Sequence, residues 1–175
     1  MSVCILTVFL AEWETMILIT HAVIGAAIAE KMQSSGLIFF TGVLSHYLSD
    51  AIPHWHYSVP RVSQAIRNDS AKKTLSFSPR FVGEFIKIAV DGILGFVFAF
   101  FFFPGNLPAI ALAVFGAMLP DFLIGLSRFY PNSLLILHQR FHRWIHSRVD
   151  LDNKPLIGIG TQLAIVVLLI AFFGV

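Results

Sequence analysis

The sequence has little charge and almost no cysteine. Only 13% of its 175 residues are charged, whereas an average soluble protein has about 25%. The formal net charge of +2 is too small and too scattered for a nucleic-acid-binding surface, so we expect no nucleic-acid partner. The single cysteine, Cys4, can form no internal disulfide and has no CxxC companion for a thiolate zinc site. Any bound metal must therefore be held by nitrogen and oxygen atoms.

Long apolar stretches take the place of charge. Apolar residues make up 57% of the chain and its mean hydropathy is +0.79, values typical of membrane proteins. A membrane-spanning helix needs about 20 apolar residues. Residues 107–126 and 156–175 meet that length, and a third helix is expected at 81–103. Two shorter apolar helices, 16–29 and 36–48, are predicted to form a hairpin.

Two polar segments interrupt the apolar ones. Residues 58–80 carry five basic residues and one acid, and residues 131–155 contain a basic amphipathic helix. Basic segments favour the cytoplasmic side of a membrane. If the first basic segment is cytoplasmic, the helices expected at 81–103 and 107–126 cross the membrane out and back, so the second basic segment lies on the same side.

Two interpretations of residues 1–15 stay open: a true extension of the first helix, or an upstream segment with Met16 as the natural start.

The predicted fold class is therefore all-α. We expect a polytopic membrane bundle of five to six helices in a single domain, residues 1–175, with one amphipathic helix near the cytoplasmic surface. That basic helix contains RFHRWIHSR, and one interpretation is that it lies on the lipid surface with Arg140 and Arg143 reaching the headgroups.

Histidines and aspartates gather where this topology places the cytoplasmic helix ends. His46, Asp50 and His54 follow one another at steps of four and so form one stripe. Pro53 disfavours a helical conformation at Ile52, so the helix is expected to end there and His54 to Tyr57 to form a turn. Steps of four also relate the three histidines of LHQRFHRWIHS. An ionisable group in a membrane helix costs about 2.5 to 3.5 kcal/mol, so it is retained mostly where it has a partner and a task. Imidazole and carboxylate groups on adjacent turns are typical ligands of zinc, manganese or iron.

Each of these residues also has a structural interpretation. A lone membrane histidine such as His21 is most often a hydrogen-bonded helix contact, Asp91 could pair only with Lys87, and Asp121 could only mark a kink after Pro120. The joint pattern favours a metal centre. The candidate metal ligands are His21, His46, Asp50, His54, His56, Asp91, Asp121, His142 and His146.

Several short motifs, in order and spacing, resemble one family. They are THAVIGAA (20–27), GVLSHYLSDAIPHWHY (42–57), VDG (90–92), FGAMLPD (115–121) and HRWIHS (142–147). They are similar to the small bacterial and archaeal inner-membrane proteins described as membrane-bound metal-dependent hydrolases. That family includes a LexA-regulated group and is distantly similar to zinc-dependent phospholipase C. The resemblance covers most of residues 16–147.

The resemblance implies metal ligands at most of the candidate positions. Those positions are His21, His46, Asp50, His54, Asp91, Asp121 and the histidines of the last motif. The chain also departs from the family pattern. Asp121 is not followed by the second acid and histidine of a PDxDH run, HRWIHS lacks the glycine of HRGxTHS, and His56 stands where related chains are expected to carry an acid.

These residues predict a hydrolase that uses a divalent metal. We expect zinc, with manganese or iron as alternatives, and a phosphoester or lipid-like substrate that arrives from the bilayer of a bacterial or archaeal inner membrane. Arg140 and Arg143 are candidates to hold a phosphate, and either Asp50 or Asp121 is the candidate general base. A non-catalytic membrane metal-binding, transport or scaffold protein and a haem protein are the alternative functions. The oligomeric state is not predicted.

Overall fold

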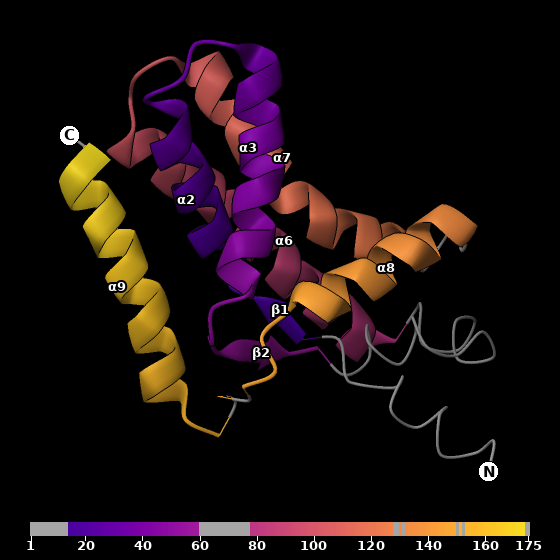
Figure 1. Cartoon of the computed structure of the whole chain (residues 1–175). Helices are drawn as coiled ribbons and strands as arrows, with labels where there is room; N and C mark the ends of the chain where they lie inside the picture. Colours follow the sequence, from indigo (N-terminus) through magenta and orange to yellow (C-terminus); the bar gives the residue numbers. More distant parts are fainter. Residues whose placement is uncertain are drawn as a thin grey trace.

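The computed structural model describes residues 14–59, 78–127, 130, 132–149, 151 and 153–173. Residues 1–13 of the proposed extension and residues 60–77 of the polar connection lie outside the described residues. Six helices dominate the described part of the chain (Figure 1). They are α2 (Leu18–Ala29), α3 (Ser35–Asp50), α6 (Pro79–Phe102), α7 (Leu107–Ser127), α8 (Ser133–Ile145) and α9 (Pro155–Phe173). The predicted helical bundle is confirmed.

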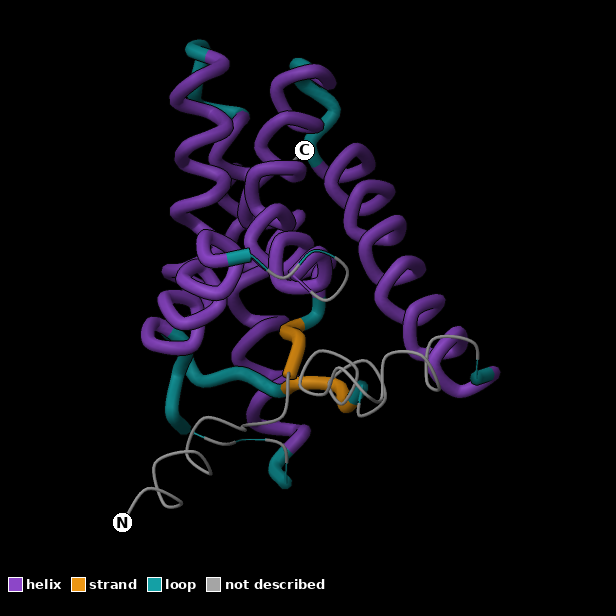
Figure 2. The backbone as a smooth tube through the Cα atoms, turned by 90° about the vertical axis from the view of Figure 1, so that its right-hand side faces the viewer, coloured by secondary structure: helices purple, strands orange, loops and turns teal. Residues whose placement is uncertain are grey.

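Three of these helices, α6, α7 and α9, are long and apolar enough to cross a membrane. The described residues also contain two short strands, β1 (Glu14–Met16) and β2 (His56–Ser58), which pair in antiparallel register with Met16 opposite His56. Figure 2 shows both strands toward the lower end of the helices. Because residues 14–16 pair with β2, the first helix of the hairpin begins at Leu18, two residues later than predicted.

Local capping explains where several helices begin. The Ser78 hydroxyl accepts a hydrogen bond from the backbone N–H of Phe81, 3.2 Å away, and Pro79 opens α6. The side chain of Asn132 accepts from the N–H of Leu135 at the start of α8. These side chains satisfy N–H groups that a first helical turn leaves without intrahelical partners.

Small residues let α2, α3 and α7 approach closely. The Cβ atoms that alanine would add at Gly25 and Gly42 would meet the same backbone oxygen, that of Ala113, at 2.9 Å and 2.5 Å. On the other side of this contact, a Cβ at Gly116 would lie 2.6 Å from the backbone oxygen of Phe39. Apolar driving force between helices is weak in lipid, so close backbone packing of this kind is a main source of helix association there.

This close contact also sets the positions of three candidate ligands. Each lies four residues, or about one helical turn, from a residue at the contact. The pairs are His21 with Gly25 on α2, His46 with Gly42 on α3, and Asp121 with Ala117 on α7. Residues four apart share a helix face, so the packing of the three helices also brings these three side chains together.

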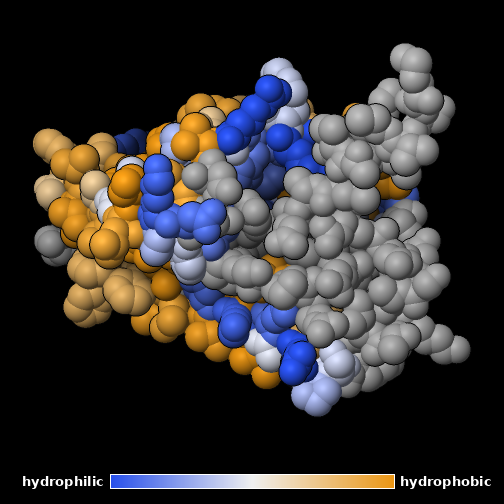
Figure 3. Space-filling view, turned by 90° about the horizontal axis from the view of Figure 1, so that it is seen from below, coloured by the Kyte–Doolittle hydropathy of each residue, from blue (hydrophilic) through white to orange (hydrophobic). Residues whose placement is uncertain are grey.

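The outer helices have a different character. Most side chains of α6 and α9 are exposed or only partly buried, and the exposed ones are largely apolar, such as Phe101, Leu156 and Phe172. Helix α9 stands at one side of the bundle (Figure 1). Seen from the end with the strands, hydrophobic residues cover the side where α9 lies and hydrophilic residues gather toward the middle of this face (Figure 3).

Candidate metal centre

Five histidine and aspartate side chains meet inside the bundle, and we call them the His–Asp group. Its members are His21 from α2, His46 and Asp50 from α3, Asp121 from α7, and His142 from α8. Their exposed fractions range from 0% to 8%, so the whole group is shielded from solvent and lipid. These donors come from four helices, so the site depends on the tertiary packing of the bundle.

The carboxylate of Asp50 lies among three imidazole rings. Its Oδ2 atom is 3.1 Å from Nε2 of His46 and 2.9 Å from Nε2 of His142, and its Oδ1 atom is 3.3 Å from Nε2 of His21. The Oδ1 atom of Asp121 lies 3.5 Å from Nε2 of His142 and 3.9 Å from Nε2 of His46. The Nε2 atoms of His46 and His142 are themselves only 3.0 Å apart.

Hydrogen bonds on the outer side of two rings fix which nitrogen carries the proton. Nδ1 of His46 donates to the backbone oxygen of Ala117, 2.8 Å away. The hydroxyl of Ser49 donates its one proton to the backbone oxygen of His46, so it must accept from Nδ1 of His21 at 3.0 Å. In the neutral form both rings therefore turn an Nε2 lone pair toward Asp50, as metal-binding histidines with a hydrogen-bonded outer nitrogen do.

Several inward atoms of the group have no hydrogen-bond partner. These atoms are Nε2 of His21 and Oδ1 of Asp50, which face each other at 3.3 Å, and Oδ2 of Asp121, all of them buried. With neutral imidazoles the group also carries two buried carboxylate charges, and each uncompensated buried charge costs several kcal/mol. A divalent cation would balance both charges and use the inward lone pairs. The group could therefore hold a metal ion.

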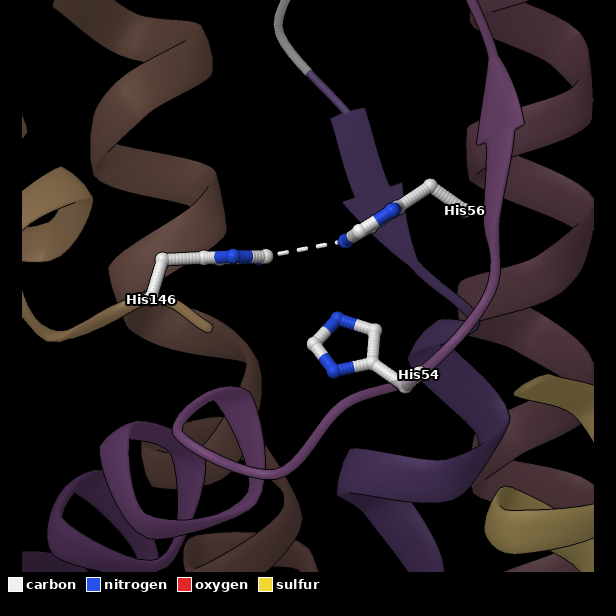
Figure 4. Close-up of side chains that lie close together, drawn as sticks. All are labelled: His54, His56 and His146. Atoms are coloured by element: carbon white, nitrogen blue, oxygen red, sulfur yellow. Dashed lines mark hydrogen bonds between the residues drawn. The ribbon is translucent and has the colours of Figure 1, made fainter. Parts of the chain in front are cut away.

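Three further histidines form the second cluster, which we call the three-histidine group. His54 and His56 come from the segment that follows α3, and His146 caps the C-terminal end of α8. One ligand nitrogen from each lies within 4.8 Å of the others, and Nε2 of His56 is 3.3 Å from Nε2 of His146. Figure 4 shows the three rings around a common space.

Neighbouring elements hold this second cluster in place. His56 belongs to β2, whose pairing with β1 fixes its backbone. In the first half of α9, the side chain of Gln162 donates to the backbone oxygen of Trp55, 2.7 Å away. The hydroxyl of Thr161 is shared between the backbone oxygens of Gly158, at 2.8 Å, and Pro53, at 3.1 Å. Gly158 lies against the backbone of Trp55, with room for no larger side chain. Helix α9 therefore positions the segment that carries His54 and His56.

Burial keeps two of these histidines neutral. Removal from water lowers the pKa of His54 to about 4, and it also lowers the pKa of His146. A neutral imidazole is the form that binds a metal ion. The rings of His54 and His146 are therefore in a ligand-competent protonation state at neutral pH.

The structure places the remaining candidate residues outside both groups. The carboxylate of Asp91 accepts hydrogen bonds from the N–H groups of Leu18 and Ile19, at 2.6 Å and 3.4 Å, and so caps the start of α2. This position explains its partial burial without a metal and separates it from the predicted ligand set.

Arg140 and Arg143 lie on an exposed side of α8, whereas His142 on the same helix is buried. The Nε–H of Arg143 donates to the backbone oxygen of Gln139, 3.3 Å away. Residues 142 and 143 differ by about 100° around the helix axis, so His142 and Arg143 point in different directions. The geometry thus places Arg143 at the surface of the molecule and not among the donor atoms.

Sequence reasoning missed the residues that support the ligands. Ser49 and the backbone of Ala117 orient the rings of His21 and His46. Of the supporting residues, Gln162 could have been noticed in the sequence, because it is the single amide side chain in a largely apolar helix. The amino-acid sequence does not show which backbone oxygens accept hydrogen bonds.

No protein-family model, curated protein or solved structure matches the chain. The fold and the site by themselves define a class: a helical protein with three helices that could span a membrane and with buried histidine and aspartate groups that could hold a metal ion.

Proposed function

We propose that the protein is a membrane-bound metal-dependent hydrolase that acts on a phosphoester or lipid-like substrate. The observation that carries the proposal is the convergence of five buried donor side chains in the His–Asp group, with inward lone pairs and unpartnered oxygens. The resemblance to the inner-membrane metal-dependent hydrolases supports it, because the resembling motifs supply the donors that meet there. We place the site at the cytoplasmic face of a bacterial or archaeal inner membrane.

The donor set suits zinc, with manganese or iron as alternatives. Three imidazoles and two carboxylates form a mixed nitrogen and oxygen environment, which these ions accept and which differs from the all-oxygen sites of magnesium and calcium. A divalent ion bound there would lower the pKa of a coordinated water toward about 7 and polarise a phosphoryl oxygen. The hydrophobic bundle around the group strengthens such electrostatic effects, because the local dielectric constant is low.

The surroundings of Asp50 and Asp121 support different roles for the two candidate general bases. Both oxygens of Asp50 face imidazole nitrogens at 2.9 to 3.3 Å, which suits a metal ligand. Asp121 has one oxygen near the imidazoles, and its other oxygen, Oδ2, is buried without a partner. We therefore assign ligand roles to His21, His46, Asp50 and His142. Asp121 is the proposed general base.

Helix α8 supplies the proposed contact with lipid. Its exposed residues include the apolar Leu134, Leu137 and Trp144, while His142 faces the bundle. The exposed Arg140 is four residues from Trp144, so the basic residues border the apolar ones. Apolar and basic residues together are typical of a helix that lies in the membrane interface. Guanidinium groups bind phosphate well, so Arg143 is proposed to bind the phosphate of an approaching lipid headgroup.

A non-catalytic metal-binding protein is the second candidate, and the near-complete burial of the His–Asp group favours it, because a closed site retains its ion.

A haem protein fits the geometry poorly. The Nε2 atoms of His46 and His142 are 3.0 Å apart and the rings of His21 and His46 stack with centroids 4.1 Å apart, which leaves no space for a porphyrin between either pair.

Metal analysis combined with a phosphodiesterase assay tests the proposal. The full chain would be purified in detergent, and hydrolysis of bis(p-nitrophenyl) phosphate and of phospholipid vesicles would be measured. His46→Ala and Asp50→Ala are expected to lose both the ion and activity. Asp121→Asn is expected to keep the ion and lose roughly 100-fold or more in rate, as removal of a general base does.

His138→Ala is the matched control, because His138 lies on α8 outside both donor groups. It is expected to keep its ion content and its activity. Full metal content in His46→Ala and Asp50→Ala contradicts the site. Metal binding without hydrolysis of either substrate class favours the non-catalytic candidate.

A further inference from the structure

We propose that the three-histidine group is a second divalent-metal site, separate from the His–Asp group and held only by imidazole nitrogens. The segment after α3 provides His54 and His56, and the C-terminal end of α8 provides His146. This inference adds a second ion to the proposed function and does not depend on hydrolysis.

The spacing of the nitrogens fits a tetrahedral ion. Zinc–nitrogen bonds are about 2.0 to 2.1 Å, so two nitrogens bound to one tetrahedral zinc lie ~3.3 Å apart. Nε2 of His56 and Nε2 of His146 are 3.3 Å apart. The third ring, His54, is only 1% exposed, and its Nε2 atom is buried without a hydrogen-bond partner. In Figure 4 this ring faces the space beside the other two.

Backbone oxygens orient two of the rings for metal binding. Nδ1 of His54 donates to the backbone oxygen of Ile52, 2.6 Å away, and Nδ1 of His146 donates to that of Ser147, 3.3 Å away. In the neutral form each ring then directs an Nε2 lone pair inward. An outer hydrogen bond of this kind is a regular feature of metal-ligating histidines.

The ligand type restricts the metal. Nitrogen ligands favour zinc, copper or nickel over magnesium and calcium, which prefer oxygen. Among the described residues no fourth histidine, cysteine, aspartate or glutamate belongs to this group. Three protein ligands with a fourth position open is the arrangement of zinc sites that exchange a water or anion. Partial exposure of His146 gives this position a route to solvent.

The two groups are neighbours but share no residue. His142 belongs to the first and His146 to the second, one helical turn apart, with ring centroids separated by 5.8 Å. The N–H of Ser147 also donates to the backbone oxygen of Asp50, 2.8 Å away, which ties the end of α8 to the end of α3. Two ions bound side by side would therefore use different members of the same two sequence motifs.

Counting bound ions in selected variants tests the inference. The detergent-solubilised full chain would be loaded with zinc, freed of unbound metal and measured by elemental analysis. Two zinc ions per chain are expected for the unchanged protein and for His138→Ala, and one for His54→Ala. His146→Gln is the second variant, because this partly exposed residue at a helix end tolerates substitution better; it is also expected to bind one. Circular dichroism checks that the helices persist.

The outcomes separate this inference from the proposed function. The second site is overturned if His54→Ala and His146→Gln both keep the zinc content of the unchanged protein. It is also overturned if the unchanged protein binds only one zinc ion and both His54→Ala and His46→Ala lose it. If instead only His46→Ala keeps its full content, the three-histidine site stands and the His–Asp site fails.

Cobalt tests the open position. The visible spectrum of the cobalt-loaded His46→Ala protein is expected to change when azide is added, because the anion enters the free coordination position. The cobalt-treated double variant His46→Ala/His54→Ala, which lacks both sites, is the control and is expected to lack this response. A spectrum of the His46→Ala protein that azide does not change contradicts an open position.

Discussion

The His–Asp group and the three-histidine group lie side by side, yet different kinds of structure hold them. The donors of the first come from four helices, three of which pack through glycine and alanine contacts. The donors of the second come from a loop, a three-residue strand and a helix cap. Sites on packed helices hold their geometry more closely than sites on loops. The comparison indicates a rigid first site beside a more adaptable second one.

The two groups also differ in charge and access. The first contains two carboxylates and is buried throughout, so an ion there would be neutralised and retained. The second contains imidazoles alone and includes the partly exposed His146, so an ion there would keep its full charge and could exchange. The following substitutions act on one group at a time.

Gly42→Val is expected to have the largest effect. An added Cβ would lie 2.5 Å from the backbone oxygen of Ala113, so α3 and α7 must separate. Overpacking of this kind costs about 1 to 3 kcal/mol. The shift moves His46 and Asp50, both on α3, relative to the ligands on other helices, His21 and His142, so the His–Asp ion is expected to be lost. Zinc content and thermal unfolding in detergent measure both effects.

Gly36→Val is the matched control for this helix, because a Cβ at Gly36 meets nothing within 4 Å. It is expected to keep the zinc content of the unchanged protein. Equal zinc content in Gly42→Val and Gly36→Val would contradict the role assigned to the close contact between α3 and α7.

Gly158→Val is expected to have a smaller and more selective effect. An added Cβ would lie 2.6 Å from the backbone nitrogen of Trp55, so the segment that carries His54 and His56 must move. A loop can move at lower cost than a packed helix, so thermal stability is expected to change less than in Gly42→Val. Zinc content is expected to fall by one ion per chain.

Gly160→Val serves as the control on α9, where an added Cβ meets nothing within 4 Å. It is expected to retain both ions. If Gly158→Val also retains both, α9 does not position the three-histidine group.

Asp91→Ala is expected to have the smallest effect on the metal centre. It removes the carboxylate that caps α2, and the loss of such a cap costs about 0.5 to 2 kcal/mol. Thermal unfolding is expected to occur at a lower temperature. Zinc content is expected to be unchanged, because Asp91 lies in neither group. A loss of zinc at full helix content would instead favour the ligand role first predicted for it.

The helices could be predicted from the sequence because apolar length is a local property. The span expected at 107–126 is α7 (Leu107–Ser127), and the one expected at 81–103 is α6 (Pro79–Phe102). The strands could not be predicted, because three residues carry no periodic pattern and their pairing joins segments about 40 residues apart. The start of α2 shifted for the same reason.

Most of the candidate ligands come together in the structure, Asp91 excepted, but their division into two groups could not be predicted. Spacing by four related His46, Asp50 and His54, and Pro53 predicted that the helix ends before His54. That prediction is confirmed, because α3 ends at Asp50. In the same way α8 ends at Ile145, so His146 departs from His142. Two residues four apart share a face only if the helix continues through both. Tertiary packing helps to decide where a helix ends.

The most direct test of the metal centre is an anomalous diffraction map from zinc-loaded crystals, recorded at the zinc absorption edge. We expect a peak at the His–Asp group, about 2.0 to 2.3 Å from Nε2 of His46, Nε2 of His142 and a carboxylate oxygen of Asp50. A zinc-loaded crystal with these side chains ordered and no peak within bonding distance of them would contradict the account.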